Sequence, residues 1–195
     1  MASAFYKLPR DFYLRPTLKV AHDLVGKFLV YKSGRNLLAA RLVEVEAYIG
    51  ENDPACHAAV GKTERNEVMY GLGGFSYIYF IYGMYHCLNV VTERENFPAA
   101  VLIRAAEPSD SIDIMRKRYA NPDSNKLTDG PGKICKAFNL TRKYNGLDLT
   151  GDKLYLEDRG YEVSKIERSR RIGIKKGIDK FWRFYDSTSA YVSRK

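Results

Sequence analysis

Short apolar segments separated by turn residues dominate the first part of the chain. Apolar side chains recur at helical spacing over 17–25 and stop at Gly26, which predicts a short helix. Two runs rich in aliphatic residues follow at 27–32 and 37–46. The polar stretch 33–36 between them contains a glycine, so the two runs are predicted to pair as a β-hairpin.

The middle of the chain changes from a polar to an aromatic pattern. Residues 49–75 are polar and glycine-rich, which predicts a long structured loop with one helical turn. Residues 76–91 are rich in aromatic and β-branched side chains. They predict two antiparallel strands that turn near Tyr82 and Gly83. Another strand is predicted over 99–105.

The second half of the chain mixes helical and strand patterns without regular alternation. A helix is predicted from Pro108 to about Tyr119, and a second opens with Pro131 in its first turn. Short alternating runs predict strands at 152–157, 161–166, 171–174, 180–185 and 189–193. This order argues against a parallel doubly wound sheet. We therefore expect a single mixed α+β domain over 1–195, built around a curved antiparallel, partly barrelled β-sheet with a protruding β-hairpin.

Composition limits the cellular setting. A length of 195 residues suits one globular domain, and 45% hydrophobic residues can build a substantial core. The N-terminal residues lack the apolar segment of a secretory signal, and no apolar run approaches the roughly 20 residues that span a membrane. We expect an intracellular protein, cytoplasmic in a prokaryote. The separated Cys56, Cys87 and Cys135 predict reduced, buried thiols rather than disulfides or a zinc site.

The positive charge is concentrated in the C-terminal third. The formal net charge is +9, and residues 126–195 hold 17 basic against 9 acidic side chains. Residues 1–125 are nearly balanced, with 15 basic and 14 acidic side chains. The segment 165–183 alone carries eight basic residues. A one-sided excess of this kind suits a polyanion such as nucleic acid, although an ordinary basic surface is an equal alternative on charge alone.

Two carboxylates occupy one predicted strand. Glu44 and Glu46 are separated by a single residue, so their side chains share one strand face. With Asp53 and His57 close by in sequence, they are candidates for a general base and its support, or for ligands of a divalent metal. The alternative is a half-polar strand that simply faces solvent.

The aromatic hairpin carries a second candidate feature. Tyr77 and Tyr79 share one strand face, whereas Tyr82 is placed at the turn beside Gly83. Aromatic residues in strands are normally core residues, but a large ring at a hairpin tip has little core to join. An exposed ring next to a basic surface is typical of side chains that stack on bases or insert between them.

A succession of motifs makes a family resemblance specific. Over nearly its whole length the chain resembles the alkyladenine (3-methyladenine) DNA glycosylase family in its compact prokaryotic form. The resemblance is carried, in order, by D-F-Y-L-R-P-T (11–17), V-E-V-E-A-Y (43–48), A-C-H (55–57), Y-I-Y-F-I-Y-G-M-Y-H-C-L-N-V (77–90), V-L-I-R-A-A-E-P (101–108), D-G-P-G-K-I (129–134), R-I-G-I (171–174) and W-R-F-Y (182–185). Glu64 and Arg170 stand where the family usually has proline, and neither change removes a proposed catalytic group.

The resemblance implies a catalytic group and its support. The second glutamate of E-x-E-A-Y, here Glu46, would position and deprotonate the attacking water. Arg104 would help to hold Glu46 and this water, together with the backbone carbonyl near Val192. Glu44 would then have a supporting or structural role. The chemistry requires no metal or other cofactor, and it would leave an abasic site.

The resemblance also implies residues that recognise the substrate. A purine flipped out of duplex DNA would lie between Tyr48 on one side and His57 with Tyr79 on the other. Asn89 would line the pocket and exclude normal guanine, and Tyr82 would fill the gap left in the duplex. The charge pattern adds Lys133 as a phosphate contact at a helix N-terminus. The expected partner is double-stranded DNA that contains alkylated or deaminated purines, bound by a monomer.

Two alternative functions remain open at this point. The first is a metal-dependent nuclease whose ligands are Glu44, Glu46, Asp53 and His57, which would be inhibited by chelators and would cut undamaged DNA. The second is a basic module that binds nucleic acid without turnover and uses its tyrosines as a stacking platform. The ordered set of motifs favours the glycosylase over both.

Overall fold

The structure is a computed structural model and describes residues 5–119 and 126–194. Within these ranges the strands are β1 (Tyr6–Lys7), β2 (Phe28–Ser33), β3 (Asn36–Ile49), β4 (Ser76–Ile81), β5 (Tyr85–Val91), β6 (Ala99–Asp110), β7 (Leu154–Asp158), β8 (Ile166–Ser169) and β9 (Arg183–Asp186). The helices are α1 (Arg10–Tyr13), α2 (Thr17–Leu24), α3 (Ile112–Arg116) and α4 (Pro131–Phe138). Three 3-10 turns are η1 (His57–Val60), η2 (Glu67–Tyr70) and η3 (Arg142–Tyr144).

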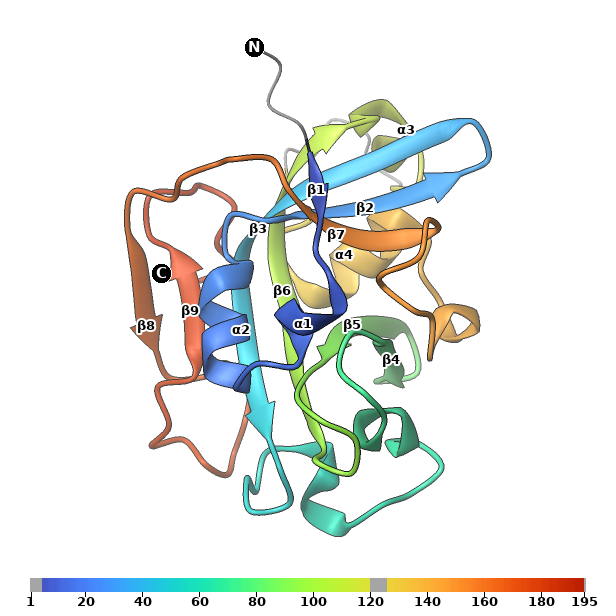
Figure 1. Ribbon diagram of the computed structural model, residues 1–195. Coiled ribbons are helices and arrows are strands. Elements are labelled where there is room, and N and C mark those ends of the chain that lie inside the picture. The colour runs from blue at the N-terminus through green and yellow to red at the C-terminus, as the bar shows by residue number, and fades with distance from the viewer. Residues whose placement is uncertain (1–4, 120–125, 195) are drawn as a thin grey trace.

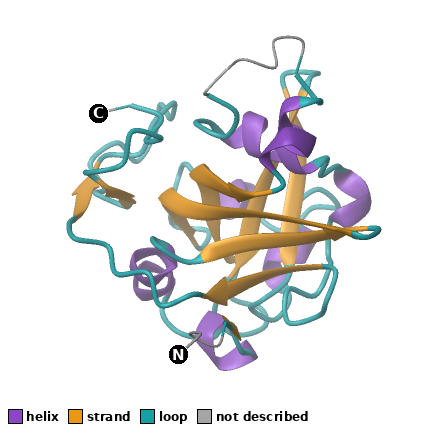
Figure 2. Ribbon diagram, turned by 90° about the horizontal axis from the view of Figure 1, so that it is seen from above, coloured by secondary structure: helices purple, strands orange, loops and turns teal. Residues whose placement is uncertain are grey.

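All nine strands of the described chain belong to one antiparallel sheet. Its main path runs β1-β7-β2-β3-β6-β5-β4, and β9 pairs with β3 and with β8. The long β3 crosses the whole molecule (Figure 1). Its first half pairs with β2, and its second half pairs with β9 on the same side. Helices and loops lie around the strands (Figure 2). The predicted α+β class is confirmed, but the sheet is open and does not close into a barrel.

The β3–β6 pair is interrupted by irregularities that shape the strands. The register shifts between Leu42 and Glu44, where Val43 is the extra residue of a bulge. Two further shifts lie between Glu44 and Val45 and between Ala39 and Ala40, where Ala40 pairs with Pro108. The predicted helix from Pro108 is therefore wrong at its start: β6 continues to Asp110, and α3 begins only at Ile112. Proline is tolerated in a strand at such a bulge because the ladder lacks a hydrogen bond there.

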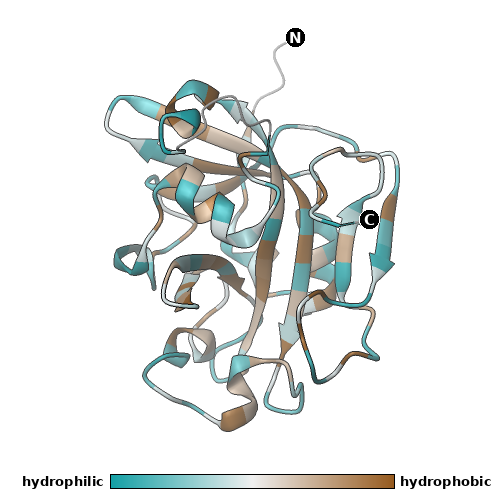
Figure 3. Cartoon of the chain, turned by 180° about the vertical axis from the view of Figure 1, so that it is seen from behind, coloured by the Kyte–Doolittle hydropathy of each residue, from teal (hydrophilic) through white to brown (hydrophobic). Residues whose placement is uncertain are grey.

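The two faces of the central strands have different contents. Val45, Ala47, Val101 and Ile103 point into the main hydrophobic core, which α2 and α4 cover. The alternate residues of the same strands point to the opposite face, because side chains alternate along a strand. This second face carries the polar and aromatic groups described below. In Figure 3 the strands of this central region are largely apolar, and the outer loops mix hydrophilic with hydrophobic segments.

Most predicted elements are confirmed, and the remaining failures lie in the C-terminal region. The helix at 17–24 and both hairpins are present, and the loop region contains two 3-10 turns. The predicted strands at 171–174 and 189–193 are wrong, since both segments are irregular, and the strand predicted at 161–166 is misplaced, since 161–165 is irregular and β8 begins at Ile166. Cys56, Cys87 and Cys135 are unpaired and buried, as predicted. No helix of the described chain is long and apolar enough to cross a membrane.

Candidate active site

The polar face of the sheet carries a row of side chains brought together by strand register. Tyr77 on β4 lies opposite Asn89 on β5, which lies opposite Leu102 on β6, which lies opposite Glu46 on β3. One pleat further along, Tyr79 is paired with Cys87 in the same way. Four strands, β3, β4, β5 and β6, therefore contribute to one surface.

A cavity of about 470 Å³ opens over this surface. Its walls contain seven of the eight residues singled out from the sequence, namely Tyr48, His57, Tyr79, Tyr82, Asn89, Arg104 and Lys133. The N-terminus of α4 and the segment 172–174 complete the lining. A concave, mostly apolar site of this volume with a few convergent polar groups is typical of a small-molecule or base pocket.

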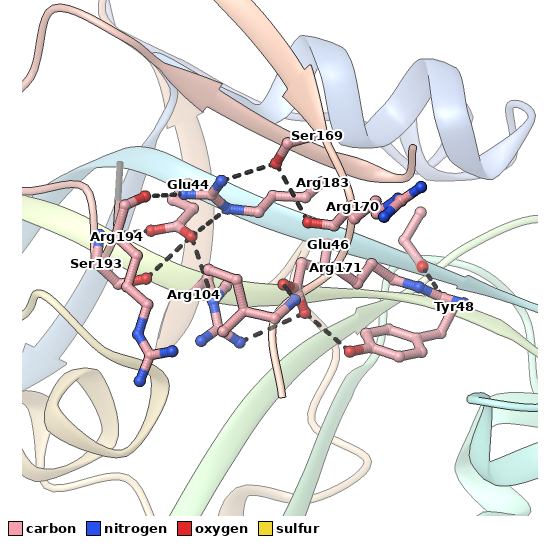
Figure 4. Close-up of polar contacts among 12 residues, drawn as sticks. Glu44, Glu46, Tyr48, Arg104, Ser169, Arg170, Arg171, Arg183, Ser193 and Arg194 are labelled. Carbon is pink, nitrogen blue, oxygen red and sulfur yellow. Dashed lines mark hydrogen bonds and ion pairs between the residues drawn. The ribbon is translucent and has the colours of Figure 1, made fainter. Parts of the chain in front are cut away.

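Glu46 lies directly beneath the cavity wall and is completely buried. Its Oε2 accepts a hydrogen bond from the Tyr48 hydroxyl at 2.8 Å, and its Oε1 accepts one from the Ile172 amide at 2.7 Å. Arg104 Nη1 is 3.4 Å from Oε2. All three partners line the cavity (Figure 4). Glu46 itself does not, so a ligand reaches this carboxylate only between its partners, and the long Arg104 contact is the loosest of them.

Burial is the largest influence on the acidity of Glu46. Removal from water raises the pKa of this carboxyl, and Glu44 adds to the increase. Arg104, the Ile172 amide and the Tyr48 hydroxyl oppose it because each stabilises the anion. Burial and the neighbouring Glu46 in turn raise the pKa of Tyr48 well above its ordinary value, so its hydroxyl remains a donor at neutral pH.

Glu44 shares the strand face of Glu46 but has a different set of partners. It accepts hydrogen bonds from Arg183 Nε at 2.6 Å and from the amide and hydroxyl of Ser193 at 2.7 and 3.0 Å. Arg104 Nε lies 3.3 Å from it. Arg104 therefore spans both carboxylates (Figure 4). Glu44 connects this arginine to the C-terminal segment, and neither glutamate faces solvent as the half-polar alternative required.

One backbone contact of Glu46 was not predicted from the sequence. The role expected for the carbonyl near Val192 stays a prediction; the side chain of Val192 packs with Val43, and the adjacent Ser193 binds Glu44. The irregular segment after Arg171 supplies the contact to Glu46 through the Ile172 amide. A backbone contact of this kind has no signature in side-chain pattern.

Aromatic side chains from two parts of the chain line the cavity. Tyr48 stands at the end of β3, and His57 contacts Tyr79 edge-to-face with ring centroids 4.5 Å apart. His57 Nδ1 is 2.8 Å from the Tyr77 hydroxyl. Burial, assisted by the cationic Arg65, lowers the pKa of His57 to about 4, so the imidazole is neutral at physiological pH.

Asn89 is held rigidly by its own sheet. Its Nδ2 donates to the backbone carbonyls of Tyr77 at 3.0 Å and Cys87 at 3.4 Å. Because the amide nitrogen is used within the sheet, the side-chain oxygen is the end that a ligand can meet. Cys87 also lines the cavity and was not singled out as a site residue from the sequence.

Tyr82 and Lys133 lie at the rim of the same cavity. Tyr82 is 78% exposed at the β4–β5 turn and has a left-handed backbone, with φ of +54°. Gly83 follows at +65°, and the pair forms the mirror-image turn that suits a hairpin. Lys133 Nζ is paired with Asp129 Oδ1 at 2.6 Å, a contact that the sequence did not predict.

Two residues of the hypothetical nuclease site, Asp53 and Glu44, form ion pairs with arginines. Asp53 is fully buried and receives both ends of the Arg171 guanidinium, at 2.5 and 2.8 Å. Glu44 is occupied by Arg183. Over the described ranges, no three His, Cys, Asp or Glu side chains are grouped so that they could hold a metal ion. The four carboxylate and imidazole groups therefore do not form a ligand set.

Comparison with known proteins gives a consistent result. Residues 11–190 match the methylpurine-DNA glycosylase family. A relative from Methanocella arvoryzae is 52% identical over 96% of both chains, and one from Alkaliphilus oremlandii is 47% identical over 97% of this chain and its own full length. A third, from Clostridium novyi, is 46% identical over 97% of this chain and 99% of its own. All three are named as candidate 3-methyladenine DNA glycosylases.

These matches confirm the resemblance read from the motifs and the predicted enzyme class, a monofunctional DNA glycosylase that takes part in DNA repair. The chain belongs to the methylpurine-DNA glycosylase family.

Proposed function

We propose that this protein removes alkylated or deaminated purines from double-stranded DNA by flipping the damaged nucleotide into the cavity and hydrolysing its N-glycosidic bond. The observation that carries the proposal is the buried Glu46 directly behind a cavity with aromatic walls. A base within a duplex is out of reach, so it must be extruded at a cost of a few kcal/mol. Stacking on aromatic rings offsets this cost by roughly 1–3 kcal/mol per ring.

Glu46 is proposed as the general base. A water held between Arg104 and the carboxylate would lose its proton to Glu46 as it attacks the sugar, whose transition state has oxocarbenium character. The anion would also stabilise that developing positive charge. Tyr48 and the pair of His57 with Tyr79 would stack on the two faces of the base. A neutral His57 adds no charge repulsion against a cationic lesion.

The lysine content of the cavity supports hydrolysis without a covalent intermediate. Lys133 is the lysine of the described cavity lining, and its ammonium is paired with Asp129 at the rim. An amine engaged in this way is a poor nucleophile. We assign Lys133 to a phosphate contact, together with the exposed Arg170, Lys175 and Lys176 of the C-terminal segment. Arg171 and Arg183 of the same segment are buried and are not available to phosphates.

The function is tested with duplexes that each contain one defined lesion, incubated with the protein in millimolar EDTA. We expect damaged purines to be released and strands to break only after alkaline treatment of the abasic sites. Undamaged duplex should stay intact. Cleavage of undamaged DNA that stops in EDTA and returns with magnesium would support the nuclease alternative instead.

Tyr82 is proposed to fill the space left by the flipped nucleotide, and Tyr82→Asn separates this role from folding. Asparagine tolerates the left-handed backbone better than tyrosine. The free energy of unfolding should therefore stay the same or rise by up to about 1 kcal/mol. Excision from duplex should nevertheless fall at least tenfold, because the wedge is lost. Stability is read by thermal unfolding and excision by single-turnover kinetics.

A loss of several kcal/mol in Tyr82→Asn would identify Tyr82 as a core residue and contradict this assignment. Tyr85 offers a control on the same hairpin. Its ring lies against Gly132 at the start of α4, so Tyr85→Ala should destabilise the hairpin as well as affect activity.

A further inference from the structure

Arg171 is a buried cation behind the cavity wall. The proposed mechanism assigns no role to it. Its side chain is completely buried, as is that of its partner Asp53. The guanidinium binds both Asp53 oxygens, and it also donates to the carbonyl of Ala47 at 3.0 Å and to that of Gly177 at 3.3 Å. Its Nε is buried without a hydrogen-bond partner.

This one side chain contacts the supports of three separate parts of the cavity. Its guanidinium lies 4.7 Å from the centre of the Tyr48 ring and 5.1 Å from that of Trp182, so it holds the back of one stacking wall. The next residue along the chain, Ile172, donates its amide to Glu46. Figure 4 shows Arg171 next to Tyr48 and close to the Glu46 cluster.

The third part is the loop that leads to His57. Asp53, fixed by Arg171, accepts hydrogen bonds from the amides of Ile49 at 3.3 Å and Ala55 at 3.2 Å. The Asp53 carbonyl accepts the amide of Cys56 at 2.8 Å, immediately before His57. The loop that carries His57, the second group of aromatic residues, is therefore tied to the same ion pair.

We propose that Arg171, paired with Asp53, is a positioning residue that sets the distance between the two aromatic walls and aims the Ile172 amide at Glu46. The inference rests on the proposed function, since it assigns Arg171 an effect on the proposed base and stacking walls. A planar, five-donor guanidinium is required for this role, because the three donors of an ammonium cannot make the four hydrogen bonds that Arg171 donates to Asp53, Ala47 and Gly177.

The chain offers a matched control in Arg41. This arginine is also buried, pairs with Asp186 at 2.8 Å and with Glu107, and stacks on Tyr161 at 4.1 Å. None of these residues lines the cavity. Removing either guanidinium leaves a buried aspartate without its partner, so Arg41→Met reproduces the loss of stability without the change at the cavity.

The test compares Arg171→Met, Arg171→Lys and Arg41→Met by single-turnover excision between pH 5 and 9 and by the ratio of affinities for damaged and undamaged duplex. The charged groups that face Glu46 are Arg104, Glu44 and Arg171, with the Tyr48 hydroxyl. Loss of the Ile172 hydrogen bond should move the acidic limb of the rate profile of Arg171→Met to higher pH by roughly one unit. Its excision at neutral pH should fall at least tenfold, and its preference for damaged duplex should fall about fivefold or more.

Arg171→Lys keeps the positive charge and should fold even if Arg171→Met does not. The acidic limb of its rate profile should move in the same direction as that of Arg171→Met. In Arg41→Met the acidic limb should keep its position on the pH scale. The excision rate and the ratio of affinities should stay within twofold of the wild type. The inference fails, and Arg171 is merely structural, if folded Arg171→Lys behaves like Arg41→Met. In that case its acidic limb keeps the same pH position, and its ratio of affinities stays within twofold of that of Arg41→Met. If the limb survives in Glu46→Gln, the proposed base is wrong, and the affinity ratio alone then decides the role of Arg171.

Discussion

Glu46→Gln is expected to abolish most excision while leaving the protein folded and able to bind lesions. Glutamine keeps the shape of the side chain and can still accept the Ile172 amide, but it cannot take a proton from water. General-base catalysis contributes roughly 10²–10⁴-fold, and loss of an anion facing a cationic transition state adds to that. Flipping, stacking and phosphate contacts do not require the carboxylate charge. Single-turnover excision should therefore collapse while affinity for lesion-containing duplex stays within a few-fold.

Glu44→Gln is the internal control because it lies on the same strand face. Glu44 is held by Arg183 and Ser193 and lies outside the cavity lining. Its neutral replacement leaves Arg183 and Arg104 less well paired, so stability should fall while excision drops by less than about tenfold. If Glu44→Gln stops excision and Glu46→Gln does not, the two roles are reversed and the site is wrong.

The second large effect is expected for Arg104→Met, which removes the cation that spans both carboxylates. Arg104 opposes the increase in the pKa of Glu46 that burial causes. A nearby opposite charge lowers a carboxyl pKa by roughly 1–3 units, so its removal should raise the pKa of Glu46 further by a similar amount. The base is active only when ionised. The acidic limb of the rate profile should therefore move to higher pH, so that excision at pH 7 falls and recovers partly as the pH is raised towards 9.

Arg104→Lys distinguishes charge from geometry at this position. Lysine keeps a cation near Glu46 but cannot reach both glutamates with a planar fork, so its rate profile should move less than that of Arg104→Met. The comparison is read from single-turnover rates across the pH range. An unmoved acidic limb in folded Arg104→Met would show that Arg104 does not set the ionisation of the base.

The sequence predicts the parts of this site that follow from strand alternation. Glu44 and Glu46 share a face, and Tyr82 sits at the turn, because period-two alternation and turn chemistry are local properties. The complete burial of Glu46 is not local. It depends on Tyr48, Arg104 and the segment after Arg171, which are brought together only by the β3–β6 pairing and the fold of the C-terminal region.

The failed predictions have an equally physical cause. The run 171–174 alternates like a strand, yet it pairs with no strand of the described chain, and its Ile172 amide binds Glu46 instead. Asp53 resembled a catalytic or metal-binding group because its partner is 118 residues away in sequence. Pro108 resembled a helix start, whereas a bulge in β6 accommodates it. In each case a long-range contact overrides a local signal.

The central claim is that water, activated by Glu46, releases a damaged purine without a covalent enzyme–DNA intermediate. It is tested most directly by incubating a single-lesion duplex with the protein in EDTA and sodium borohydride and measuring both the free base and any trapped protein–DNA adduct. The account predicts release of the intact modified purine, an uncut strand with an abasic site, and no adduct, with release lost in Glu46→Gln. A trapped adduct, or unchanged release by Glu46→Gln, would contradict it.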